Sequence, residues 1–231
     1  MMSEILSSAT FFGVMISILS YEVGLWLKRK TNLALFNPLL IAILVTIAAL
    51  LLLGIDYESY NAGAKYLSYL LTPATVCLAI PLYEQLHLLV HNVKAILIGI
   101  VAGVLSSIGS VFALCLLFGL GHTEYVTLLP KSITTAIGMG VSEELGGIVT
   151  ITVSVIIITG VLGNIIAESV CKVFRVTNPI AKGIAIGTSA HAIGTARALE
   201  MGEIEGAMSS LAIAVSGLIT VGTASVFSGL I

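Results

Sequence analysis

The stretch AIGTSAHAIGTARALEMGE, residues 185–203, places several polar side chains in a strongly apolar chain. Thr188 and Thr195 are seven residues apart, about two helical turns, and His191 lies between them at helical spacing. On a continuous helix these three side chains would share one polar face. Because histidine titrates near neutral pH, and ionisable groups within membrane helices are by default functional, His191 is a candidate for proton coupling.

Arg197 and Glu200 stand at i and i+3 in the same stretch, so they can form an ion pair. Pairing lowers the cost of holding either charge away from water. Glu200 is therefore a second candidate for proton coupling, and Arg197 is a candidate ligand for a carboxylate. Gly187 and Gly194 repeat at the same seven-residue interval and would let another backbone approach closely.

A second group of candidate side chains follows Pro130 in LLPKSITTAIGMGVSEELGGI, residues 128–148. Backbone groups freed by a broken membrane helix must be satisfied by protein or by water in a cavity, and hydroxyl side chains can do this. The N-terminus of a half-helix attracts anions, and Lys131 would add a full positive charge. The alternative is that Lys131 reaches the membrane surface and the hydroxyls only close the helix. The sequence leaves both interpretations open.

Together, the two stretches predict a binding site for a small organic anion. Its predicted ligands are Lys131, Ser132, Thr134, Thr135, Thr188, Ser189, His191, Thr195 and Arg197.

The composition defines the class of protein. Only 10% of the 231 residues are charged and 58% are hydrophobic, whereas soluble domains carry roughly 25% charged residues. Residues 95–120 form a run longer than the roughly 20 apolar residues that a spanning helix needs. The net charge of −2 gives no reason to expect nucleic acid as a partner. The sequence has no motif of common hydrolases, nucleotide-binding proteins or zinc sites, so we expect neither an enzyme nor a cofactor or metal.

We therefore predict an all-α membrane protein, a polytopic helical bundle with interrupted or re-entrant helices. Continuous spans are expected at residues 9–27, 37–54, 95–120, 147–170 and 207–231. Interrupted segments are expected at 66–90, 128–145 and 179–199, and the second should break near residues 134–140. The predicted break positions are Pro73, Pro81, Pro130, Gly138, Gly140, Gly146, Gly147, Gly187 and Gly194.

Two pairs of similar segments indicate an internal inverted repeat within a single domain, residues 1–231. ATVCLAIPLYEQL, from Ala74, aligns with ITTAIGMGVSEEL, from Ile133, and Asn-Pro opens the segments at Asn37 and Asn178. Interrupted segments at corresponding places in two halves are typical of transporters that bind their substrate at the breaks. Separately, GIVAG at 99–103 would allow close contact between helices, either within one protomer or between two protomers. Contact between protomers would give a homodimer.

Three long segments resemble the LrgB/CidB family of bacterial membrane proteins, and the likeness extends over nearly the whole chain. They are LTPATVCLAIPLYEQLHLL, LLPKSITTAIGMGVSEELGGI and NPIAKGIAIGTSAHAIGTARALEMGEIEGAMSSLAIAVSGLIT. The family is described as antiholin-like or holin-like and is similar to the second half of the plastid glycolate/glycerate translocator of plants. The resemblance implies a multi-pass protein of the bacterial cytoplasmic membrane that acts alone or with an LrgA/CidA-type membrane partner.

Two functions follow from the residues and the resemblance. The preferred hypothesis is a transporter of small monocarboxylates of the glycolate, glycerate or pyruvate class, coupled to protons through His191 and Glu200. The alternative is a holin-like or antiholin-like membrane protein that regulates murein hydrolase activity and autolysis.

Overall fold

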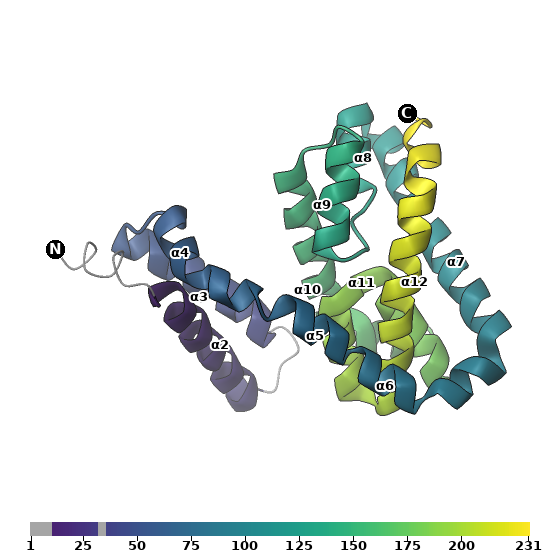
Figure 1. The fold of residues 1–231 in the computed structure, drawn as a ribbon, viewed down its shortest axis with the longest axis horizontal. Coiled ribbons are helices and arrows are strands. Elements are labelled where there is room, and N and C mark those ends of the chain that lie inside the picture. The colour runs from purple at the N-terminus through teal and green to yellow at the C-terminus, as the bar shows by residue number, and fades with distance from the viewer. Residues whose placement is uncertain (1–10, 32–35) are drawn as a thin grey trace. The chain divides into compact units, whose positions relative to one another are not determined.

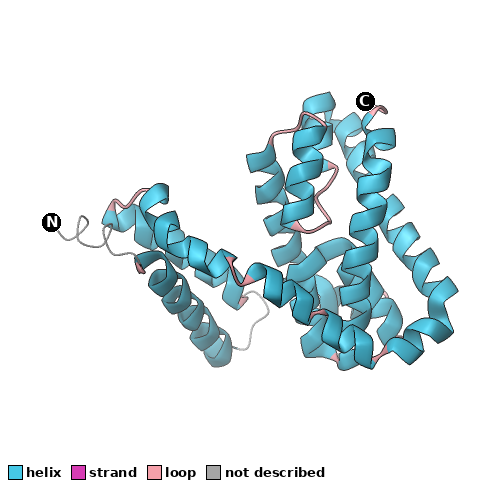
Figure 2. Cartoon of the chain, in the orientation of Figure 1, coloured by secondary structure: helices cyan, strands magenta, loops and turns pink. Residues whose placement is uncertain are grey.

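The computed structural model describes residues 11–31 and 36–231. These residues form helices joined by turns and loops, and no strand occurs among them (Figure 2). The predicted all-α membrane fold is confirmed. The chain divides into two compact units, residues 1–77 and 78–231, which are described separately below. The assignment of one domain to the whole chain stays a prediction.

The first unit is built on close contacts between α2 and its neighbours α3 and α4. Its described helices are α2 (Phe12–Thr31), α3 (Pro38–Leu53), α4 (Tyr57–Ser68) and α5 (Leu71–Cys77). A Cβ at Gly13 would lie 2.2 Å from the carbonyl oxygen of Tyr60, and one at Gly24 would lie 2.5 Å from that of Pro38. Glycine at these two positions therefore permits backbone-to-backbone packing.

The second unit contains the long helices and all the cavities described below. Its helices are α6 (Ala79–Glu84), α7 (Leu86–Phe118), α8 (His122–Leu128), α9 (Thr135–Glu144), α10 (Val149–Val173), α11 (Pro179–Met201) and α12 (Glu203–Ser228). Helix α11 packs against α7, α10 and α12 and so occupies the middle of this unit (Figure 1).

Among the described helices, α7, α10 and α12 are long and apolar enough to cross a membrane. The five predicted spans correspond to α2, α3, α7, α10 and α12. Helix α3 is apolar but has only 16 residues. The predicted start of the first span at Ala9 lies outside the described residues.

The apolar side chains of α7 fill the space over α11 and α12. Ile96, Ile100, Val104 and Ile108 recur every fourth residue, so they lie on one face of α7, and all are buried. They pack with Ile184 of α11 and with a group of small or flexible side chains on α12. Helices α11 and α12 approach closely because a Cβ at Gly187 would lie 2.4 Å from the carbonyl oxygen of Ser209.

Both Asn-Pro dipeptides begin helices, as predicted. The side chain of Asn37 accepts hydrogen bonds from the backbone N–H groups of Leu39 and Leu40 at the start of α3. Asn178 caps α11 in the same way, through Ile180 and Ala181. These matching caps support the similarity of the two segments, while the inverted repeat itself stays a prediction.

Of the predicted break positions, only Pro130, Gly146 and Gly147 lie outside the described helices. Pro73 and Pro81 each occupy the third position of a short helix, α5 and α6. Proline is tolerated there because N–H groups of the first turn have no partner within the helix. The breaks lie instead before these prolines, where Tyr69, Leu70 and Leu78 leave the helical pattern.

The segment 128–145 is interrupted, but its break comes earlier than residues 134–140. Pro130 lies in the turn between α8 and α9, and α9 then continues through Gly138 and Gly140. Gly138 serves packing, because a Cβ there would lie 2.4 Å from Ile156 of α10. Gly146, with φ of 79°, and Gly147 lie in the connection from α9 to α10. Gly187 and Gly194 lie within α11, and the break in that helix is at His191.

The contact between α11 and α12 can be tested with two glycines. Gly187→Ala would place a methyl group against the Ser209 carbonyl oxygen and should lower the free energy of unfolding by about 1–3 kcal/mol. A Cβ at Gly109 of α7 would have no atom within 4 Å, so Gly109→Ala should be neutral or stabilising by up to about 1 kcal/mol. Thermal unfolding in detergent measures both. Equal stability of the two variants would contradict the described packing.

Candidate functional site

Lys131 lies in the turn between α8 and α9 and reaches toward α7. Its Nζ donates hydrogen bonds to Ser132 Oγ at 3.0 Å and to Ser107 Oγ at 3.3 Å, and the two hydroxyls are 2.8 Å apart. Ser132 is buried. The turn is short because Pro130 follows the end of α8 and the backbone N–H of Lys131 bonds back to the carbonyl of Leu128. The ammonium group is thus held on two hydroxyls from separate elements.

A cavity of about 710 Å³ opens beside this lysine, between α7 and α11. Its polar lining comes from α7, from the Lys131 turn and from α11 with its cap: Asn92, Ser106, Ser107, Ser110, Lys131, Ser132, Asn178, Thr188 and Ser189. We call it the Lys131 cavity. A smaller cavity of about 420 Å³ shares Lys131 and Ser189 with it and extends along α10.

No carboxylate among residues 11–31 and 36–231 lies within ion-pair distance of Lys131. A lysine that is partly buried and bound only to hydroxyls keeps an uncompensated positive charge next to the cavity. Such a charge attracts a counter-ion, and hydroxyls can donate further hydrogen bonds to it. The arrangement can therefore hold a small anion.

The predicted anion ligands are divided by the structure. Lys131, Ser132, Thr188 and Ser189 all line the Lys131 cavity. Thr134 and Thr135 lie at the start of α9, outside this lining, and His191, Thr195 and Arg197 also lie elsewhere. The sequence analysis missed the serines of α7 and Asn92. For the serines, the signal was the polar run SSIGS at 106–110 within an otherwise apolar span.

His191 interrupts α11 with φ of 41° and ψ of −143°. This conformation is rare for any residue with a side chain, and such strained residues are often found at functional sites. The imidazole is only 2% exposed, and its Nε2 lies 2.9 Å from the carbonyl oxygen of Ile156 on α10. A Cβ at Gly160 would lie 2.7 Å from the imidazole ring, so the glycine makes room for it.

Side chains from three helices satisfy the polar groups around this break. Asn164 of α10 donates to the carbonyl oxygen of Ile193 at 2.7 Å. Thr195 Oγ1 donates to the carbonyl oxygen of His191 at 3.0 Å and lies 2.7 Å from Ser209 Oγ of α12. Backbone groups freed within a membrane helix must find such partners, because lipid offers none.

The predicted polar face of Thr188, His191 and Thr195 does not form. Because the helix breaks at His191, its 3.6-residue period does not continue across that residue. Thr188 lies beside Gly103 of α7, His191 contacts α10, and Thr195 contacts α12. His191 lines neither of the two cavities that contain Lys131.

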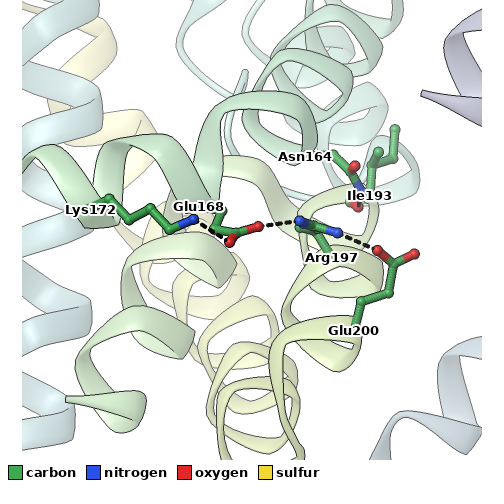
Figure 3. Close-up of polar contacts among 6 residues, drawn as sticks. All are labelled: Asn164, Glu168, Lys172, Ile193, Arg197 and Glu200. Carbon is green, nitrogen blue, oxygen red and sulfur yellow. Dashed lines mark hydrogen bonds and ion pairs between the residues drawn. The ribbon is translucent and has the colours of Figure 1, made fainter. Parts of the chain in front are cut away.

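Arg197 belongs to a separate charged network (Figure 3). The predicted pair is confirmed, with Arg197 Nη1 2.6 Å from Glu200 Oε2. Arg197 Nη2 also binds Glu168 of α10, whose other oxygen lies 2.8 Å from Lys172 Nζ. The sequence analysis did not recognise Glu168 as a partner of Arg197 or Lys172, although its i, i+4 spacing to Lys172 indicates a pair.

These charges line a second cavity of about 710 Å³, which we call the charged pocket. Its lining residues are Glu168, Cys171, Lys172, Arg175, Val176, Thr177, Lys182, Arg197, Glu200 and Met201. Lys131 is not among them, so Arg197 and Lys131 do not form one carboxylate site. No group of three or more His, Cys, Asp or Glu side chains in the described part of the chain could hold a metal ion.

Gly99 and Gly103 are used inside the second unit. A Cβ at Gly103 would lie 2.7 Å from Thr188 Oγ1, and one at Gly99 would contact Ile184, both on α11. These glycines therefore do not support a contact between subunits, and the homodimer stays a prediction.

The fold and the buried polar groups define the class of the protein: an all-α membrane protein whose polar side chains face the inside of a helical unit. Residues 17–230 match the LrgB-like family, and the chain belongs to this family. It is 40% identical over 212 residues to the antiholin-like protein LrgB of Bacillus cereus, covering 91% of this chain and 92% of the relative. The antiholin-like protein LrgB of Bacillus anthracis matches equally well. No solved structure matches the chain.

These relatives overturn the preferred function derived from the sequence. The monocarboxylate transporter hypothesis is wrong, because the similar proteins carry the description antiholin-like and cover almost the whole chain. The error came from the interrupted helices, which are typical of transporters but do not by themselves establish transport. The proton-coupling role of His191 and Glu200 was part of that hypothesis and loses its basis with it.

The strained backbone at His191 should reverse the usual order of stability, in which alanine is more stable than glycine in a helix. Inside a regular helix, glycine is less stable than alanine by about 1 kcal/mol. At the φ of His191, alanine keeps strain of about 1–3 kcal/mol that glycine lacks. We therefore expect His191→Gly to be more stable than His191→Ala, although both lose the contact with Ile156.

Thermal unfolding of the two purified variants measures this order. The matched control is Ala185→Gly, in the regular first half of α11, compared with the unchanged chain, and it should show alanine as the more stable residue at that position. Alanine being the more stable residue at position 191 as well would contradict the described break.

Proposed function

We propose that this chain is an antiholin-like membrane protein that restrains murein hydrolase activity and so limits autolysis. The observation that carries the proposal is the 40% identity to antiholin-like LrgB proteins over 91% of the chain. Identity spread over almost the whole length of both proteins supports a shared role better than a match to one segment would.

The proposed role is not enzymatic and is located at the bacterial cytoplasmic membrane. Three described helices that are long and apolar enough to span support a multi-pass arrangement. Regulation of this kind requires contact with other membrane proteins, so a second copy of the chain and an LrgA/CidA-type protein are the proposed partners.

Within this role, the Lys131 cavity is proposed as a regulatory binding site for a small anion. Its support is the uncompensated ammonium group beside three serines, Ser107, Ser110 and Ser132, in a cavity of about 710 Å³. A bound anion would neutralise Lys131 and connect α7 to the turn before α9.

Deletion of the gene in its native bacterium tests the restraining role. Cells without the protein should show higher murein hydrolase activity in zymograms and lyse faster in detergent, and the intact gene supplied in trans should reverse both effects. Slower lysis after deletion would indicate a holin-like role instead. Unchanged hydrolase activity and lysis would refute the proposal.

The Lys131 cavity can be tested in the same strain. Lys131→Gln removes the positive charge but keeps a side chain that can hydrogen-bond, and it should restore the normal lysis rate less well than the intact protein. Lys94→Gln, which removes an exposed charge from α7, is the matched control and should restore it fully. Equal amounts of both variants in the membrane fraction must be shown by immunoblot. Full restoration by Lys131→Gln would remove this lysine from the functional site.

A further inference from the structure

The charged pocket lies at one end of a candidate spanning helix. Helix α10 has 25 residues, which is about 37 Å of helix at roughly 1.5 Å per residue. The hydrocarbon core of a bilayer is about 30 Å thick, so the ends of such a helix reach the lipid headgroups. Lys172 stands in the last turn of α10 and lines the pocket. If α10 crosses the bilayer, the pocket lies near the depth of the lipid phosphate groups.

Two exposed apolar side chains flank the basic residues at this end. Val173 is 76% exposed and Phe174 is 74% exposed. They lie directly between Lys172 and Arg175 in the sequence. Exposed aromatic and aliphatic groups beside basic ones are typical of a segment that contacts the membrane interface.

Among the charged residues in and around the pocket, Arg175 has no acidic partner within the described ranges. Lys172 and Arg197 pair with Glu168, Arg197 also pairs with Glu200, and Lys182 lies 3.6 Å from Glu205. Four basic residues therefore face three acidic ones. Across the described ranges, no carboxylate lies within ion-pair distance of Arg175. An anion in the pocket would meet one uncompensated guanidinium group, which can bind phosphate with two hydrogen bonds.

The backbone at Arg175 does not explain why arginine stands there. Arg175 has φ of 53°, its N–H bonds to the carbonyl of Lys172, and the N–H of Val176 bonds to that of Cys171. This is a Schellman cap, in which the left-handed position is usually glycine. The left-handed φ is less favourable for arginine than for glycine, whereas the positive charge suits the C-terminal end of the helix. The guanidinium group is therefore the feature that calls for a role.

We propose that the charged pocket binds the phosphate headgroup of an anionic phospholipid, with Arg175 as the principal ligand. Its volume of about 710 Å³ accommodates a phosphodiester and its glycerol. Val173 and Phe174 lie next to Arg175 and would contact the start of the acyl chains. Basic pockets between helices at the membrane surface are known to bind anionic headgroups.

The test compares the melting temperature of the full chain in vesicles of phosphatidylcholine alone and with added phosphatidylglycerol. The anionic lipid should raise it by about 2–4 °C. Arg175→Gly should abolish this rise, because it removes the guanidinium group, yet it should fold at least as well in phosphatidylcholine because glycine suits the backbone at this position. Arg175→Lys should keep part of the rise.

Three results would overturn the proposal. Lys94→Gln removes an exposed charge elsewhere in the second unit, and an equal loss of the rise in that variant would show general attraction to the surface. A lower melting temperature of Arg175→Gly in phosphatidylcholine alone, by the same amount as in the anionic vesicles, would show that Arg175 only supports the fold. An equal rise with inorganic phosphate or glycerol phosphate in phosphatidylcholine vesicles would assign the pocket to a soluble ligand.

Discussion

The second unit depends on the satisfaction of backbone groups where α11 breaks at His191. A helix in lipid has no water to bond with an exposed carbonyl, so a break is stable only where neighbouring helices supply donors. Asn164 of α10 and Thr195 of α11 donate to the two carbonyls at the break, and the imidazole of His191 bonds to α10. These contacts require α10 and α12 to lie close to α11, and the glycines at 160 and 187 make that approach sterically feasible.

The two polar regions of the second unit are lined by different residues of α11. Before His191, Thr188 and Ser189 face the Lys131 cavity, while Lys182 in the first turn lines the charged pocket. The half of α11 after His191 also brings Arg197 and Glu200 to the charged pocket. One region holds an ammonium group bound only to hydroxyls, and the other holds charges that are largely paired. The two can therefore bind different ligands, and a change at one does not remove the charges of the other.

The separation of the Lys131 cavity from the charged pocket also bears on the function of the protein. The transporter hypothesis had Lys131 or Arg197 receive a carboxylate where the interrupted segments meet, and the structure places these two residues in different cavities. The proposed regulatory role rests on the similarity to antiholin-like proteins, and such a role does not require a continuous path through the protein.

Local rules within the sequence determined a large part of the fold. Apolar runs predicted the positions of α2, α3, α7, α10 and α12. Asn-Pro predicted the starts of α3 and α11, and the spacing of Arg197 and Glu200 predicted their ion pair. Each depends on residues within a few positions of one another, through hydropathy, capping or helical period. Lys131, Ser132, Thr188 and Ser189 were also recognised as candidates, from their polarity in an apolar setting.

Tertiary structure alone decided where α11 breaks and which polar groups meet. Prolines and glycines indicated the interrupted segments, but Gly187 and Gly194 stayed helical, because their missing side chains serve close packing. The break fell at His191, where α10 presents the carbonyl of Ile156 and the amide of Asn164. Glu168 meets Arg197 across 29 residues for the same reason. Such partners are brought together by helix packing, and no local pattern in the sequence records which distant backbone will lie opposite.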